Sequence, residues 1–108
     1  MKPCKPKILV NGDYFNIAKC RCCNRIGLYY KNILIGFESI DFDCFAKSFL
    51  DIFFEKYKTE FPDGKDHIVI NSAHKDIQFT FTRQEYIELK DMIQQARLLL
   101  ESENILEG

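Results

Sequence analysis

The chain has 108 residues, enough for one ordinary domain with its own hydrophobic core and too few for two. Hydrophobic residues make up 46% of it, including ten Phe and five Tyr, which excludes an intrinsically disordered chain. Fifteen basic residues balance sixteen acidic ones, so the net charge of −1 predicts neither a nucleic-acid-binding protein nor one that binds anionic membranes.

A β-hairpin is predicted at the start of the chain. Apolar residues flank Asn11-Gly12, and this dipeptide accepts the positive φ angles of a two-residue turn. The second strand of the hairpin should run to about Cys20. The segment from Cys20 to Asn24 then connects it to the next strand.

Two further strands are predicted at 26–30 and 33–37, where apolar residues alternate with a period of two. A two-residue turn at 31–32 would pair these strands antiparallel and place Gly27 directly opposite Gly36. Two facing glycines would leave a flat patch on the second face of the sheet, where another backbone or ring could approach closely.

A first helix is predicted over about 41–57, because aromatic residues recur there at intervals of three and four. The stripe expected to face the sheet consists of Phe42, Phe45, Phe49 and Phe53. Leu50, Phe54 and Tyr57 would then form an interaction patch toward the edge of the helix. We expect this patch to meet a second copy of the chain as a homodimer; the alternative is that the second helix covers it.

The second half of the chain repeats the same order of elements. Strands are predicted at 67–70 and 77–81, and the second of these has the clearest alternation in the chain. Thr82 and Glu85 have the spacing of a capping box. They should therefore start a second helix, over 83–101.

Together these elements predict a single α+β domain over residues 1–108. Its core would be a single antiparallel sheet of four to six strands, built from a hairpin followed by two ββα units, with both helices packed on one face. Residues 1–6 and 102–108 are expected to fray at the ends of the chain.

Three cysteines crowd into the connection that follows the second strand. Cys20 and Cys23 have the C-x-x-C spacing of a zinc knuckle, but a structural zinc site takes four ligands, and no second C-x-x-C or suitably spaced histidine pair is present. Cys4 and Cys22 are nearby in sequence, but Cys22 should point away from its neighbours in a knuckle. A redox pair is disfavoured, because the motif lies between two strands and not at a helix N-terminus. We therefore expect Cys20 and Cys23 to be reduced and without an intrachain zinc ion.

The sequence predicts no catalytic site and no cofactor-binding site. No Ser or Cys nucleophile is tied to His67 or His74, no acid–base pair can be named, and the glycines lack the spacing of a phosphate loop. We expect a small non-enzymatic interaction or regulatory module that contacts itself or another protein, and neither nucleic acid nor membrane. A small structural metal-binding module that uses Cys20 and Cys23, with zinc as its ion, is the alternative.

The cytoplasm is the expected location. The apolar run after Lys7 is only three residues long, well short of the roughly 7–15 of a secretory signal, and no stretch approaches the roughly 20 of a spanning helix. An odd number of cysteines without an export signal is typical of a compartment that keeps thiols reduced.

Several of these motifs together resemble a known family. They are Asn11-Gly12, Cys20-x-x-Cys23, Ile26-x-Leu28, Asn32-Ile33 and Phe37. The resulting pattern is similar to the NG…CxxC…IxLxF-GNIxLxF of an uncharacterised family of small cytosolic proteins, chiefly from Bacteroidota, and the resemblance spans most of residues 8–101. The chain departs from that pattern at Tyr30-Lys31, where an aromatic residue and Gly are usual, and at Asn24, where Gly often follows the second Cys. Because the family is a domain of unknown function, the resemblance supports the fold and implies no activity.

Overall fold

The computed structural model describes residues 5–72 and 74–107, and the side chains of all of these except 104–107. In chain order the elements are β1 (Pro6–Asn11), β2 (Phe15–Cys20), β3 (Ile26–Tyr30), β4 (Ile33–Phe37), α1 (Ser39–Leu50), α2 (Phe54–Tyr57), β5 (Thr59–Glu60), β6 (Asp66–Asn71), β7 (Gln78–Thr82) and α3 (Arg83–Glu107). The predicted α+β class and the antiparallel pairing are confirmed.

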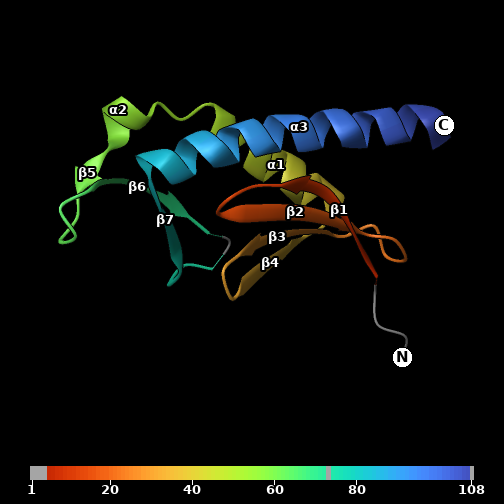
Figure 1. Cartoon of the computed structure of the whole chain (residues 1–108), viewed down its shortest axis with the longest axis horizontal. Helices are drawn as coiled ribbons and strands as arrows, with labels where there is room; N and C mark the ends of the chain where they lie inside the picture. Colours follow the sequence, from red (N-terminus) through yellow and green to blue (C-terminus); the bar gives the residue numbers. More distant parts are fainter. Residues whose placement is uncertain (1–4, 73, 108) are drawn as a thin grey trace.

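The strands form two sheets, so the prediction of a single sheet is wrong. Strands β1 to β4 make a four-stranded sheet in sequential order, and β5 to β7 make a separate three-stranded sheet. The connection through α2 carries the chain away from the first sheet to the N-terminal end of α3. There β5, β6 and β7 pair only with one another. Figure 1 shows α3 spanning both sheets, with β6 and β7 at its N-terminal end and β1 and β2 along its middle.

The register predicted between the third and fourth strands is confirmed. Tyr30 pairs with Ile33, and Gly27 pairs with Gly36. The patch left by these glycines is occupied by neighbouring side chains. A Cβ atom on Gly27 would lie 3.0 Å from a methyl carbon of Leu34 and 3.2 Å from the Tyr29 ring.

The first hairpin is present, but its turn differs from the predicted one. Asn11 pairs with Asn16, so four residues separate the paired positions instead of two. In the described chain the residues with a positive φ are Asn24, Lys31 and Gly64, and Gly12 is not one of them. Gly12 is required for a different reason, namely the close approach of α3: a Cβ atom there would lie 2.5 Å from the Met92 sulfur and 2.7 Å from the Glu88 carboxyl carbon.

The predicted helix over 41–57 is two helices. Helix α1 ends at Leu50, and α2 is a separate single turn that begins at Phe54. The break changes which aromatic side chain faces the core: Phe53 is 74% exposed, whereas Phe54 is 5% exposed. The hydroxyl of Tyr86 on α3 donates a hydrogen bond to the Ile52 carbonyl at 2.5 Å, which satisfies a backbone group that the break leaves open.

The capping box at the start of α3 is confirmed. The Thr82 amide donates to the Glu85 carboxylate at 2.9 Å, and the Glu85 amide donates to the Thr82 hydroxyl at 3.3 Å. The helix then runs to Glu107, so its predicted end at residue 101 falls six residues short. Residues 1–4 and 108, which were expected to fray, lie outside the described part of the chain.

One hydrophobic core joins both sheets and the helices. Its largest fully buried side chains are Phe15, Ile17, Ile26 and Leu28 of the first sheet, Phe42 and Phe49 of α1, Ile68 of the second sheet, and Leu89 and Ile93 of α3. The ring of Phe81 bridges the sheets, with its centroid 5.8 Å from that of Phe15 and 5.6 Å from that of Phe49. Among the described residues, no helix has both the length and the apolar character needed to cross a bilayer.

Candidate metal centre

The cysteine turn, which we define as residues 20–25, connects β2 to β3. Its ends are joined by a hydrogen bond from the Cys20 amide to the Arg25 carbonyl at 2.8 Å. Between them Asn24 has φ 57°, in the left-handed region that Asn adopts more readily than most residues. This left-handed residue turns the chain back into β3 immediately after the third cysteine.

The turn brings three sulfur atoms together. The Sγ atoms of Cys20, Cys22 and Cys23 all lie within 4.8 Å of one another, and those of Cys20 and Cys22 are 3.4 Å apart. A tetrahedral zinc ion with Zn–S bonds of about 2.3 Å separates its sulfur ligands by about 3.8 Å. The observed spacing is therefore of the size that a single ion needs. The expectation that Cys22 points away from its neighbours is wrong.

The donor set of the turn suits soft cations. Thiolate ligands favour zinc, copper(I) and iron–sulfur chemistry, whereas magnesium and calcium prefer oxygen. Cys22 and Cys23 are exposed and Cys20 is partly buried, so an ion can reach the sulfur atoms from solvent. The group can therefore hold a thiophilic metal ion with at least three ligands.

Two contacts fix the turn to the start of α1. Arg25 forms an ion pair with Glu38, with 2.5 Å between the nitrogen and the carboxylate oxygen. The hydroxyl of Ser39 donates to the carbonyl of Asn24 at 3.2 Å. These contacts hold the backbone on the Asn24 side of the turn, whereas the cysteine side chains extend from the other part of it.

The remaining cysteine of the described chain lies apart from this cluster. Cys44 is on α1 and is exposed. It gives the protein a built-in control, because it shares the chemistry of the cluster without its geometry.

The predicted interaction patch does not form one surface. Phe54 packs inside its own chain, with its ring centroid 5.5 Å from that of Tyr86 and the guanidinium of Arg83 4.7 Å from its centroid. Leu50 is partly buried, and Tyr57 is 57% exposed. The alternative considered from the sequence therefore holds for Phe54, since the second long helix covers its side chain.

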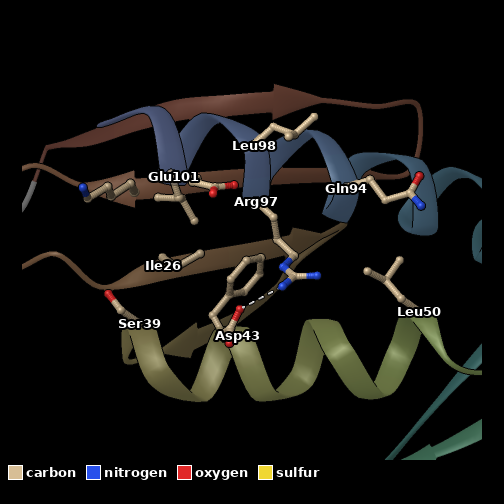
Figure 2. Close-up of a pocket in the computed structure, with 11 residues that line it drawn as sticks. Ile26, Ser39, Asp43, Leu50, Gln94, Arg97, Leu98 and Glu101 are labelled. Atoms are coloured by element: carbon tan, nitrogen blue, oxygen red, sulfur yellow. Dashed lines mark ion pairs between the residues drawn. The ribbon is translucent and has the colours of Figure 1, made fainter. Parts of the chain in front are cut away.

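A groove runs between α1 and α3. Its volume is about 720 Å³, and it is lined by apolar residues such as Ile26 and Phe42 together with charged residues from both helices. Figure 2 shows Arg97 extending from α3 toward Asp43 on α1, and the two form an ion pair at 3.4 Å. Hydrogen bonds from Lys47 and then the charge of Arg97 keep the pKa of Asp43 below its usual value. The ion pair joins the two sides of the groove.

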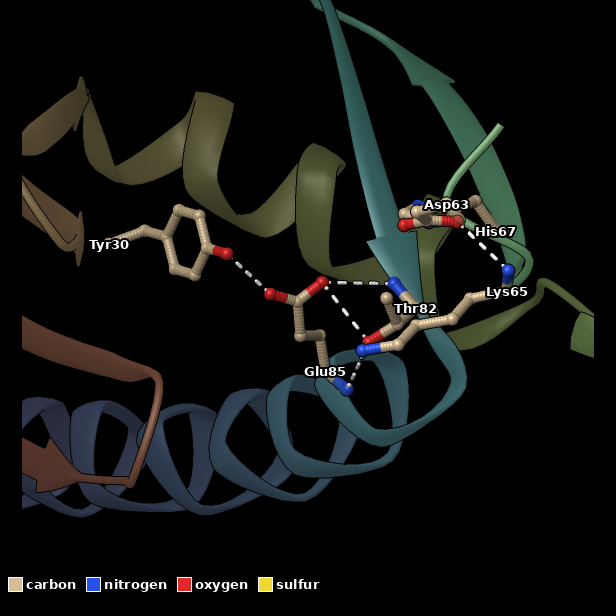
Figure 3. Close-up of polar contacts among 6 residues, drawn as sticks. All are labelled: Tyr30, Asp63, Lys65, His67, Thr82 and Glu85. Atoms are coloured by element: carbon tan, nitrogen blue, oxygen red, sulfur yellow. Dashed lines mark hydrogen bonds and ion pairs between the residues drawn. The ribbon is translucent and has the colours of Figure 1, made fainter. Parts of the chain in front are cut away.

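A second polar group lies where the two sheets approach the start of α3. The Tyr30 hydroxyl donates to the Glu85 carboxylate at 2.5 Å, and Figure 3 shows the ring extending from the first sheet toward the helix. This hydrogen bond, followed by burial, raises the pKa of Tyr30 to about 12. Burial would raise the pKa of Glu85, but the hydrogen bonds from Tyr30 and Thr82 outweigh it and the pKa is lowered. A tyrosine held protonated by a helix-capping carboxylate indicates a structural role.

His67 lies on the second sheet near this group. Its Nε2 atom is 2.8 Å from the carboxylate of Asp63, and its ring stacks on that of Phe61 with centroids 4.1 Å apart. Its Nδ1 atom is buried and has no hydrogen-bond partner in the described part of the chain.

Sequence reasoning found the Glu85 cap but missed its partner Tyr30, because the two residues are 55 positions apart.

Comparison with known proteins identifies a family and nothing more. No curated protein and no solved structure matches the chain significantly. A family model matches residues 2–106, and its description is a family of unknown function. Since the match spans nearly the whole chain, the resemblance found in the sequence is confirmed, and the protein belongs to the family of unknown function DUF6686.

Proposed function

We propose that the protein is a small non-enzymatic module that binds a zinc ion at the cysteine turn. The observation that carries this proposal is the convergence of three thiols, from Cys20, Cys22 and Cys23, within 4.8 Å at one connection. Sequence reasoning favoured a zinc-free turn because a structural zinc site takes four ligands and only Cys20 and Cys23 were expected in position. The third sulfur, from Cys22, reduces the number of missing ligands from two to one.

The surroundings of the turn support metal binding. Its side chains lie at the surface, so burial of apolar area contributes little to its stability. Metal–sulfur bonds would link the end of β2 to the start of β3. They would stabilise the turn at a place where few apolar side chains pack. A reducing cytoplasm, the location expected from the sequence, would keep the thiols in the form that binds metal.

Metal content and cysteine variants test the proposal. Protein purified with reductant and without chelator should carry zinc, and the apoprotein should bind it with one ion per chain. Replacing Cys20, Cys22 or Cys23 singly by Ser should weaken zinc binding by about tenfold or more, since each change removes one ligand. Cys44→Ser is the matched control and should bind as the unmodified protein does.

Cys22→Ser gives the sharpest result. A two-cysteine knuckle built on Cys20 and Cys23 alone would keep its affinity in this variant, which would contradict the three-sulfur centre. Failure of the unmodified protein to bind zinc at micromolar concentration would contradict the proposal as a whole.

We also propose that the protein self-associates, with its contact at Phe53 and Tyr57. Phe53 is 74% exposed and Tyr57 is 57% exposed. The Tyr57 amide donates to the Phe53 carbonyl at 3.3 Å, so the two side chains are one helical turn apart on the same side. An aromatic pair left in water favours a protein partner over nucleic acid, given the near-neutral charge of the chain.

Light scattering at micromolar concentration should report a dimer, and Phe53→Glu should yield a monomer. Ile87→Glu, which changes an exposed apolar residue of α3, is the control and should remain dimeric. A monomeric unmodified protein would rule out this contact.

A further inference from the structure

Cys20 and Cys22 form a close pair within the cysteine turn. Their Sγ atoms are 3.4 Å apart and share a hydrogen bond, and the Sγ atom of Cys23 lies within 4.8 Å of both. Only Arg21 separates the two residues in the chain. The turn therefore holds two thiols close enough for direct chemistry between them.

The 3.4 Å separation of this pair falls between those of two bonded states. The sulfur atoms of a disulfide are about 2.05 Å apart, and those around a tetrahedral zinc ion are about 3.8 Å apart. Either state needs a relative shift of about 1.4 Å or less, which rotation of the two side chains can supply. The backbone can stay in place, because the Cys20 amide bonds to the Arg25 carbonyl and the Arg21 amide to the Lys5 carbonyl.

The turn is open to small oxidants, and its surroundings favour the thiolate form. Cys22 and Cys23 are exposed, and so is Arg21. A positive charge near a thiol favours the thiolate, and a bound metal ion deprotonates its thiol ligands outright. The sequence disfavoured a redox pair because no helix N-terminus promotes deprotonation at this position. A zinc ion at the turn meets that requirement.

We propose that the zinc site at the cysteine turn is regulated by oxidation: hydrogen peroxide converts Cys20 and Cys22 to a disulfide, and the ion is released. This inference rests on the zinc binding proposed above and names the regulation of that site. In a reducing cytoplasm such a disulfide would be transient, as sensing disulfides there usually are. Metal occupancy of the turn would then report the level of peroxide.

The oxidation proceeds in two steps. In the first, the exposed Cys22 thiolate attacks hydrogen peroxide, the O–O bond breaks, a sulfenic acid forms, and the hydroxide that leaves is protonated to water. In the second, the Cys20 thiolate attacks the Cys22 sulfur, the S–O bond breaks, and a second hydroxide leaves and is protonated to water. The two sulfur atoms lose two electrons in total, and the peroxide gains them. Because thiolates bind zinc and disulfides do not, two of the three described ligands are lost.

Peroxide treatment of the zinc-loaded full chain tests this regulation. After removal of reductant, a small molar excess of hydrogen peroxide should release one zinc ion for each disulfide formed, as read by a chelating dye and by the loss of alkylatable thiols. Circular dichroism should not change, because none of the three cysteines belongs to the hydrophobic core of the described chain. Dithiothreitol followed by zinc should restore the bound ion. Cys44→Ser is the matched control and should release zinc in the same way.

Trypsin locates the disulfide, because it cleaves after Arg21, between the two cysteines. In the oxidised and denatured chain, a bond between Cys20 and Cys22 should hold the two tryptic fragments together until reductant separates them. Alkylation of the denatured chain before digestion should label Cys23 and leave Cys22 unlabelled. Cys23→Ser, although it should bind zinc more weakly, should still form the linked fragments at the same dose of peroxide.

The outcomes separate this inference from the zinc site itself. A protein that binds zinc and retains it when peroxide is added would overturn the regulation and leave the zinc site standing. A bond from Cys20 to Cys23, or from either fragment to the one that contains Cys4, would overturn the assignment to the Cys20–Cys22 pair. A protein that binds no zinc would contradict both proposals, whatever disulfide it formed.

Discussion

The two ends of β2 are held in different ways. At its start, the Glu88 carboxylate of α3 accepts hydrogen bonds from the amides of Asp13, Tyr14 and Phe15, at 2.7, 2.8 and 3.1 Å. Gly12 allows this contact by letting the helix pass close to the turn. The first turn is thus completed by a side chain of the protein.

At the other end, the same helix reaches the strand but not the turn. Glu103 pairs with Lys19 at 2.9 Å and with Lys7 at 3.2 Å, so it holds side chains of β2 and β1. The cysteine turn beyond them has its own backbone hydrogen bond and three converging sulfur atoms. The comparison shows that α3 provides a carboxylate at each end of β2, about 22 Å apart along the helix, and that only one of them secures a turn.

The largest effect is expected at the first turn. Gly12→Ala places a Cβ atom 2.5 Å from the sulfur of the buried Met92 and 2.7 Å from the Glu88 carboxyl group that binds the turn, so these two side chains must shift. We expect a loss of about 3 kcal/mol in the free energy of unfolding, at the upper end for an overpacked site, as measured by urea denaturation. Gly36→Ala is the control: its Cβ would lie 3.1 Å from the flexible end of Arg25 and should cost less than about 1 kcal/mol. Equal losses for the two variants would contradict the role given to α3.

Removal of the carboxylate should have the next largest effect. Glu88→Ala leaves three backbone amides without their acceptor, and water replaces it only in part. We expect a loss of about 2 kcal/mol in the free energy of unfolding. Asp91→Ala, which removes an exposed carboxylate bound to Gln95 one turn further along α3, should change it by less than about 0.5 kcal/mol. A negligible loss for Glu88→Ala would mean that the turn holds itself.

Chelation should affect only the second turn. Hydrogen exchange in the zinc-loaded protein should slow at the amides of Cys20 and Arg21, which bond to Arg25 and Lys5. Removing zinc should speed exchange there about tenfold by local opening, and the amides of Asp13 and Tyr14 should not respond. A uniform response at both ends would show that the metal acts on the whole fold instead.

The smallest effect is expected for Glu103. Hydrogen bonds from Lys19 and then Lys7 keep the pKa of its carboxyl below the usual value. Because the pKa of Glu103 is lower in the folded than in the unfolded protein, its interactions stabilise the fold at any pH above the unfolded pKa. This stabilisation is lost as the pH falls through the folded pKa. Because the ion pairs lie at the protein surface and Glu103 is only partly buried, Glu103→Gln should cost about 0.5 kcal/mol at neutral pH. The difference from the unmodified protein should vanish in acid, and a difference that grows in acid would contradict the ion pair.

Local patterns in the sequence predicted what depends on neighbouring residues. Alternation placed the strands at 26–30 and 33–37, and their two-residue turn set the pairing of Gly27 with Gly36. The Thr82 capping box is equally local, since donor and acceptor are three residues apart. Such features follow from the chain's own geometry.

What the sequence could not predict depends on distant residues. Phe54 lies in the core and Phe53 in solvent because α1 ends before them. Just after that end, the hydroxyl of Tyr86 binds the carbonyl of Ile52, 34 positions away in the chain. Gly12 suggested a turn by its type, yet its role is set by a helix that arrives 76 positions later in the chain, at Glu88. The three-sulfur cluster was missed because the spacing rule considers Cys20 and Cys23 alone, whereas the folded turn also brings the Cys22 sulfur within 4.8 Å of both.

The position of α3 has a consequence in time. Both sheets precede α3 in the sequence, yet the helix covers the core-facing side of β1 and β2 and also contacts β6 and β7. A ribosome adds roughly 5–20 residues each second, so several seconds separate the synthesis of the first hairpin from that of its cover. During that interval Phe15 and Ile17 lack the cover of α3. The nascent chain is therefore the form most exposed to aggregation, and slowing translation between residues 40 and 83 should lower the yield of folded protein more than slowing it after residue 100.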